Sequence, residues 1–182
     1  MSPNAVAQTI LDEISKVMAQ IDADAVRAAC DVITSAHNIM LYGCGREGLQ
    51  MQGLAMRFHH LGLRVCMQGD MAAPPIGRGD LFIVSAGPGE LGTVNALMGA
   101  ARRDGAEVLF LTAVPQTRAA GLATRIIEIP ARTMAVDEGG TMPMGSAYEG
   151  ALFVLGEVLV AELTGLLNQS PEDMRARHTN ME

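Results

Sequence analysis

The sequence predicts an α/β fold in which a five-stranded parallel sheet is covered by helices on both faces. Short runs of apolar residues alternate with helix-like stretches, and strands that are apolar throughout are typical of a parallel sheet buried on both sides. Two of these runs, 39–42 and 81–84, end directly in glycine-rich turns. The chain of 182 residues contains no linker-like segment, so we expect one domain over residues 1–182.

Two helices are expected before the first strand. Ser2 and Pro3 form an N-cap with proline at the first helical position, and apolar residues then recur at helical spacing as far as Ile21. Asp22 is expected to cap a second helix. The apolar residues of that helix are Val26, Ala29, Cys30 and Ile33.

Strands and helices alternate in the central part of the chain. The segment 132–144 is the least regular and is expected to form a loop. Strands are expected at 39–42, 64–67, 81–84, 108–112 and 126–129, with helices near 49–61 and 91–103 and a shorter helical piece at 117–123.

The C-terminal part is expected to contain a long helix over 146–167 and a short one beginning at Ser170-Pro171-Glu172-Asp173. The long helix is apolar on almost every side, which is typical of a helix buried on most of its surface. It is either a central helix of the domain or a helix that packs partly on another subunit. We expect self-association.

Composition and charge exclude several classes of protein. The formal charge of −7 argues against a general nucleic-acid binder, which needs a basic face. No apolar run is long enough to cross a bilayer, and the first residues lack the pattern of a secretory signal.

The chain has three cysteines, Cys30, Cys44 and Cys66, an odd number without metal-ligand spacing, so we expect reduced thiols in a cytoplasmic protein. Cys44 is interpreted as a small apolar filler behind its loop.

Two glycine turns are the main functional signal: Gly43-Cys44-Gly45-Arg46-Glu47-Gly48, and Ser85-Ala86-Gly87-Pro88-Gly89-Glu90. A strand that ends in glycines and continues as a helix aims backbone N–H groups at one spot, which favours an anion. The first turn also reads GxGxxG, and Asp70 follows the second strand as in a nicotinamide-binding fold. Two leading helices, the second glycine turn and the lack of room for a substrate domain argue against that alternative.

The chain resembles the sugar isomerase (SIS) family, and within it the 6-phospho-3-hexuloisomerases. The resemblance covers nearly the whole chain. It implies a flavodoxin-like three-layer SIS domain, a homotetramer, and isomerisation of a sugar or sugar phosphate between aldose and ketose through an enediol(ate), without metal or organic cofactor. The matching motifs are the first glycine turn, Ala55-Met56-Arg57-Phe58-His59-His60-Leu61-Gly62, Tyr148-Glu149-Gly150, Leu159-Val160-Ala161-Glu162-Leu163 and Arg177-His178-Thr179-Asn180-Met181-Glu182.

The resemblance also implies roles for individual residues. Glu149 matches the candidate base, with a helix-initiating or salt-bridging Glu as the alternative. His178 lies on a segment that in the family reaches a neighbouring subunit's site, and His60 is the better match of the adjacent pair on the helix after the first turn. A solvated His178 and a hydrogen-bonded core His60 are the alternatives. The expected substrate-binding residues are Gly43, Gly45, Arg46, Glu47, Ser85, Ala86, Gly87, Gly89, Glu90 and Thr93.

Three positions depart from the family pattern. Glu47 stands where the family has a serine, and Ala86 and Pro88 stand where two serines hold the sugar phosphate. Ser85 replaces one hydroxyl if the register slips by one, and Thr93 is a second candidate donor. Either Glu47 points away and pairs with Arg46, or the ligand carries a hydroxyl, an amine or another head group there.

These departures keep two further functions open. One is a non-catalytic module that binds a sugar phosphate or serves regulation, and the other is an isomerase for a sugar with a non-phosphate head group.

Overall fold

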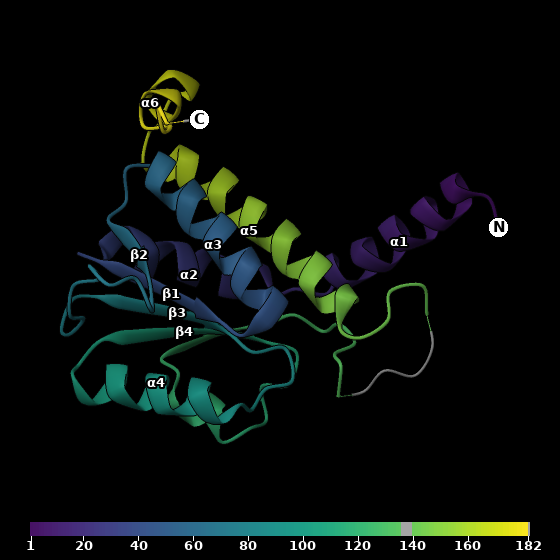
Figure 1. The fold of residues 1–182 in the computed structure, drawn as a ribbon, viewed down its shortest axis with the longest axis horizontal. Helices are drawn as coiled ribbons and strands as arrows, with labels where there is room; N and C mark the ends of the chain where they lie inside the picture. Colours follow the sequence, from purple (N-terminus) through teal and green to yellow (C-terminus); the bar gives the residue numbers. More distant parts are fainter. Residues whose placement is uncertain (136–139, 182) are drawn as a thin grey trace.

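A parallel five-stranded sheet in the order β2-β1-β3-β4-β5 forms the centre of the molecule. The computed structural model describes residues 1–135 and 140–181 (Figure 1). This strand order is that of flavodoxin-like folds, so the predicted fold class is confirmed. The strands are β1 (Ile39–Gly43), β2 (Val65–Met67), β3 (Leu81–Ser85), β4 (Glu107–Thr112) and β5 (Arg125–Glu128).

Helices cover both faces of the sheet and divide the core in two. Helices α2 (Ala23–Ser35), α3 (Gly45–His60) and α5 (Ser146–Leu166) cover one face, and α4 (Gly92–Arg103) with the short 3₁₀ helix η1 (Ala119–Leu122) covers the other (Figure 1). Successive strand residues point to opposite faces. Ile83 therefore belongs to the core under α3 and α5, and Phe82 to the core above α4.

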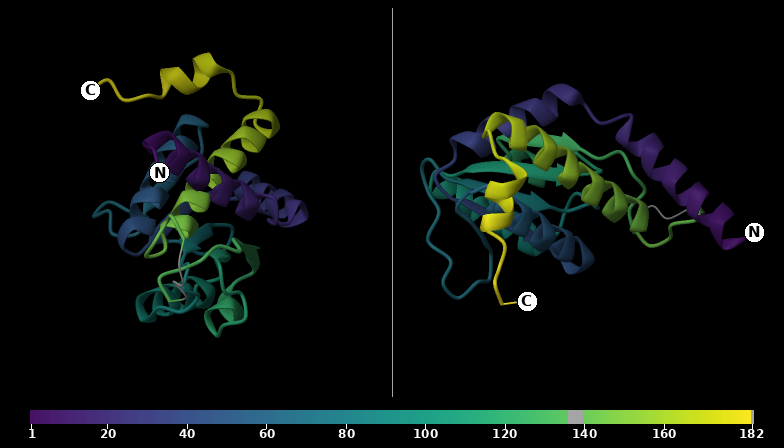
Figure 2. Two further views of the ribbon diagram at one scale, coloured as in Figure 1. Left: turned by 90° about the vertical axis from the view of Figure 1, so that its right-hand side faces the viewer. Right: turned by 90° about the horizontal axis from the view of Figure 1, so that it is seen from above.

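The two terminal helices extend away from the sheet. Helix α1 (Pro3–Met18) packs on α5 and leads outward to the N-terminus, while α6 (Pro171–Ala176) lies beyond the ends of α3 and α5 (Figure 2). Both begin as the sequence predicts. Ser2 Oγ accepts a hydrogen bond from the N–H of Ala5. Ser170 and Asp173 form a reciprocal capping box.

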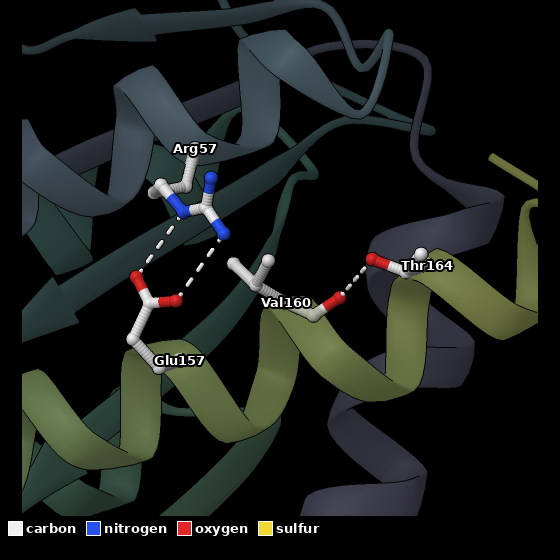
Figure 3. Close-up of polar contacts among 4 residues, drawn as sticks. All are labelled: Arg57, Glu157, Val160 and Thr164. Carbon is white, nitrogen blue, oxygen red and sulfur yellow. Dashed lines mark hydrogen bonds and ion pairs between the residues drawn. The ribbon is translucent and has the colours of Figure 1, made fainter. Parts of the chain in front are cut away.

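Helix α5 is the central helix of its layer, in contact with α1, α2 and α3. Arg57 of α3 donates two hydrogen bonds to Glu157 of α5, at 3.1 and 3.2 Å (Figure 3). Further along α5, Thr164 Oγ1 donates to the carbonyl of Val160 at 2.7 Å, which satisfies the hydroxyl within the helix (Figure 3). Phe153 of α5 nevertheless remains 58% exposed.

One boundary near the first glycine turn matters for the site. Helix α3 begins at Gly45, four residues before the expected 49–61, so Arg46 and Glu47 lie in its first turn. Gly45 has φ +57°, which few other residues adopt.

The described residues of 132–144 form neither helix nor strand, as expected, and residues 136–139 of that predicted loop lie outside the described part. Among the described helices, none is both long and apolar enough to cross a membrane.

Candidate active site

A pocket of about 400 Å³ opens where the carboxyl ends of β1 and β3 meet the start of α5. In an open parallel sheet, ligands bind at the carboxyl ends of the strands, at the point where strand order reverses. The volume is within the range of small-molecule sites. Its walls are Cys44, Gly45, Arg46, Glu47, Gly87, Pro88, Leu91, Thr133, Met134, Met144, Gly145, Tyr148 and Glu149.

A cavity of similar size, about 440 Å³, lies at the opposite ends of the strands. Asn38, His59 and Arg64 line it, next to the amino ends of β1 and β2. Its walls contain no carboxylate from the described residues. The candidate chemistry is therefore concentrated in the pocket at the carboxyl ends.

The Glu47 side chain lies across the second glycine turn. One carboxylate oxygen accepts the hydroxyl of Ser85 at 2.5 Å, and both oxygens accept the backbone N–H of Gly87, at 3.0 and 3.1 Å. Glu47 therefore takes the donors that the second turn would otherwise offer to an anion. Of the two alternatives that the sequence leaves open, the pairing of Glu47 with Arg46 is not found, because Arg46 pairs with Glu149 instead.

Tyr148 extends this network into the core. Its side chain is 1% exposed, and its hydroxyl lies 3.1 Å from Ser85 Oγ. Since the single Ser85 proton is donated to Glu47, Tyr148 donates to Ser85. Its ring also fills the space beside Gly87, where a Cβ would lie 2.8 Å from a ring carbon. In the sequence, Tyr148 belongs to the motif Tyr148-Glu149-Gly150, and the signal that could have identified it is that the chain contains only two tyrosines.

Arg46 and Glu149 face each other across the mouth of the pocket. Arg46 Nη2 lies 2.6 Å from Glu149 Oε2, and Arg46 Nη1 donates to the hydroxyl of Ser146. The Glu149 side chain is 13% exposed, whereas that of Arg46 is 60% exposed. The contact is an ion pair without hydrogen-bond geometry, so the buried Oε2 has no hydrogen-bond partner among the described residues.

Burial controls the protonation of all three acidic groups. Desolvation raises the pKa of Glu47, opposed by the hydrogen bonds from Ser85 and Gly87, while the charge of Glu149 raises it further. Desolvation also raises the pKa of Glu149, and the nearby Arg46 lowers it. Burial and the charge of Glu47 raise the pKa of Tyr148, which therefore stays protonated.

The structure brings together some of the expected site residues and separates others. Gly45, Arg46, Glu47, Gly87 and Glu149 line the pocket, and Ser85 supports it from behind. The other expected binding residues are absent from its described walls. Gly43 packs against Gly48, and Ala86 is fully buried in the core above α4. Gly89 lies in its turn with φ +85°, and Glu90 and Thr93 are exposed.

His60 and His178 lie together at the other end of α3. Their rings stack with centroids 5.3 Å apart. His60 is buried and His178 is exposed. Glu47 is in the first turn of α3 and His60 is its last residue, so about 20 Å of helix separates them. Within one chain, neither histidine lies in the pocket that contains Glu149.

The described residues contain no cluster of three or more histidine, cysteine, aspartate or glutamate side chains able to hold a metal ion. Cys44, interpreted as a filler, is half-buried and lines the pocket, with its sulfur 3.4 Å from the Tyr42 hydroxyl.

Comparison with known proteins gives consistent matches. Residues 32–152 match the SIS domain family. The chain is 32% identical to the 3-hexulose-6-phosphate isomerase of Mycobacterium gastri over 176 residues, which covers 95% of this chain and 88% of that protein.

Two solved structures share the fold. A hypothetical protein of Methanococcus jannaschii, whose structure infers a function of 3-hexulose-6-phosphate isomerase, has a TM-score of 0.83 at 23% identity and covers 97% of both chains. The Vibrio vulnificus NanR protein complexed with ManNAc-6P has a TM-score of 0.76 at 22% identity, over 95% of this chain and 66% of that one.

Proposed function

Because the chain belongs to the SIS domain family, we propose that it is a sugar isomerase that interconverts an aldose and a ketose. Glu149 is the observation that carries this proposal. Its carboxylate lies in the pocket and is mostly buried, with Oε2 2.6 Å from the guanidinium of Arg46. A desolvated carboxylate is a stronger base than one in water, as proton transfer from carbon requires.

The proposed reaction moves one proton between adjacent carbons. Glu149 removes the proton from the carbon next to the carbonyl, and the electron pair of that C–H bond forms the double bond of an enediolate. A proton passes from the neighbouring hydroxyl to the former carbonyl oxygen, and the protonated Glu149 returns its proton to the former carbonyl carbon while the neighbouring carbon becomes the new carbonyl. The Arg46 guanidinium, next to Glu149, would stabilise the negative oxygen of the enediolate.

We assign His178 a role in the pocket of a neighbouring copy of the chain. Its own pocket is about one helix length away, while α6 and the C-terminal residues extend beyond the sheet (Figure 2). Large apolar side chains on α3 and α5, including Met56 at 50% exposed and Phe153, offer a surface for such self-association. There His178 would exchange protons with the sugar oxygens or assist ring opening.

Solvent exchange tests the isomerase directly. Candidate aldoses and ketoses, with and without phosphate, are incubated with the protein in deuterated water, and deuterium at the carbon next to the carbonyl is followed by NMR. We expect exchange with the wild type and its loss in Glu149→Gln.

Glu157→Gln is the matched control, because it removes a carboxylate from the same helix but outside the pocket. This variant should retain exchange once its folding has been verified by circular dichroism. Tight sugar binding without exchange in any candidate would contradict the enzyme proposal.

The same measurement tests a second candidate, a non-catalytic module that binds a sugar phosphate. The ion pair between Arg46 and Glu149 favours this alternative, because it occupies the proposed base. The likeness to NanR complexed with ManNAc-6P gives a structural parallel. Binding that survives Glu149→Gln unchanged, with no exchange, is the expected result for such a module.

A further inference from the structure

The second glycine turn has the geometry of an anion site and already holds an anion of this chain. The N–H of Gly87 and the hydroxyl of Ser85 both donate to the carboxylate of Glu47. Pro88, the next residue, has no N–H to donate. An incoming phosphate would therefore have to compete with Glu47 for these two donors.

The charges of the pocket also oppose a phosphate. Its charged walls among the described residues are Arg46, Glu47 and Glu149, one cation and two carboxylates. Arg46 is held by Glu149, so Glu47 has no cation paired with it in the described residues. A phosphate dianion beside Glu47 would meet a like charge in a partly desolvated place, where Coulomb repulsion is strong.

The remaining walls favour a neutral ligand. Pro88, Leu91, Met134 and Met144 face the pocket with apolar side chains. Placing a second full charge against such surfaces costs desolvation, and the one cation among the described walls, Arg46, is already paired with Glu149. Hydroxyl groups, in contrast, can donate to the carboxylate oxygens of Glu47 and still bury their carbon atoms.

We propose that the pocket binds the unphosphorylated, hydroxyl-bearing end of a sugar at the second glycine turn, with the Glu47 carboxylate occupying the place of a phosphate. This inference rests on the proposed function only in taking a sugar as the ligand. The preference for an unphosphorylated end depends on the Glu47 side chain alone, so we expect one substitution at this position to reverse the preference. Glu47→Ser removes the carboxylate, frees the donors of Ser85 and Gly87, and adds a hydroxyl.

Binding measurements test the proposal without turnover. Inorganic phosphate and matched pairs of ketoses, each with and without a terminal phosphate, are titrated by calorimetry at pH 8 into the full chain. In the wild type, the unphosphorylated member of the tightest-binding pair should bind at least as tightly as its phosphate ester. In Glu47→Ser, the Kd for inorganic phosphate and for the ester should fall at least tenfold.

Two further variants keep the test interpretable. Glu47→Gln preserves the size of the side chain and removes its charge, so its affinity for phosphate should change in the same direction if Glu47→Ser fails to fold. Asp31→Ser removes one exposed carboxylate on α2, outside the described walls of the pocket, and should bind phosphate like the wild type.

Each result then separates the two proposals. An ester that binds the wild type tenfold more tightly than its unphosphorylated partner overturns the inference, as does a phosphate affinity that neither Glu47 variant changes. An amino sugar that binds more tightly than its hydroxyl counterpart also overturns it. Deuterium exchange with a phosphate ester alone would support the isomerase and contradict the proposed unphosphorylated ligand. The predicted affinities without exchange would support the unphosphorylated ligand and contradict the isomerase.

Discussion

The Ser85 hydroxyl lies at the centre of the hydrogen-bond network behind the pocket, and its removal should destabilise the protein measurably. The residue is fully buried, and its hydroxyl contacts Glu47 at 2.5 Å and Tyr148 at 3.1 Å. Ser85→Ala loses a hydrogen bond to a charged group, worth about 1.5–3 kcal/mol, and leaves the buried Tyr148 hydroxyl without this acceptor, which costs about 1–3 kcal/mol. Because effects at neighbouring groups do not simply add, we expect a net loss of about 3 kcal/mol.

Thermal and denaturant unfolding at pH 8, followed by circular dichroism, measure this loss. For a domain of this length, about 3 kcal/mol corresponds to a fall in Tm of about 6–12 °C. Ser35→Ala is the control, because Ser35 is exposed at the end of α2 and its removal should stay within about 0.5 kcal/mol. A Ser85→Ala protein as stable as that control would refute the network.

Three more outcomes follow from the described contacts. Burial raises the pKa of Glu47 above its ordinary value of 4.5, so the folded state retains a proton that the unfolded state has released. The unfolding free energy of the wild type, relative to that of Glu47→Gln, should therefore fall as pH rises above 4.5 through the folded-state pKa, by at most about 1.4 kcal/mol per pH unit. Denaturation of both proteins at several pH values measures this difference, and a difference that rises with pH would contradict the prediction. Denaturation of the single and double alanine variants of Arg57 and Glu157 should give a coupling of about 0.5–1 kcal/mol that declines with salt, since both groups are partly exposed. Mixed oligomers of Glu149→Gln and His178→Ala, refolded together, should recover deuterium exchange that neither variant has alone, whereas a mixture as inactive as its components would contradict a site shared between two copies of the chain.

The sequence predicts the strands of the sheet well because they depend on local patterns. Apolar runs that end in glycine turns identify the strands, whereas their order is implied only by the family resemblance. The turns at residues 43–48 and 85–90 do meet at one edge of the sheet, since β1 and β3 are neighbours. Boundaries are less certain, because the glycines that begin α3 look like loop residues in the sequence.

The sequence could not predict how the side chains around Glu47 pair. Glu47 and Ser85 are 38 residues apart, and Tyr148 comes from a helix on yet another part of the chain. Locally, the sequence allows Glu47 either to pair with Arg46 or to face the ligand. The actual partners become available only when β1 and β3 align in register and α5 covers the end of the sheet. The separation of His178 from Glu149 likewise depends on helix lengths and packing rather than on any motif.

The fold explains how such a pocket can change its ligand without changing its backbone. The N–H of Gly87 belongs to the main chain and persists whichever side chains surround it, whereas the second donor is the Ser85 hydroxyl and Pro88 has no N–H to add. What fills the second turn then depends on the first residues of α3, the helix after the neighbouring glycine turn, from which Glu47 reaches Ser85 and Gly87. In this chain Glu47 is at that position and takes the donors itself. A serine there would leave the same donors open to a phosphate, so the ligand is set by a single helical position while the sheet, the turns and Glu149 stay in place.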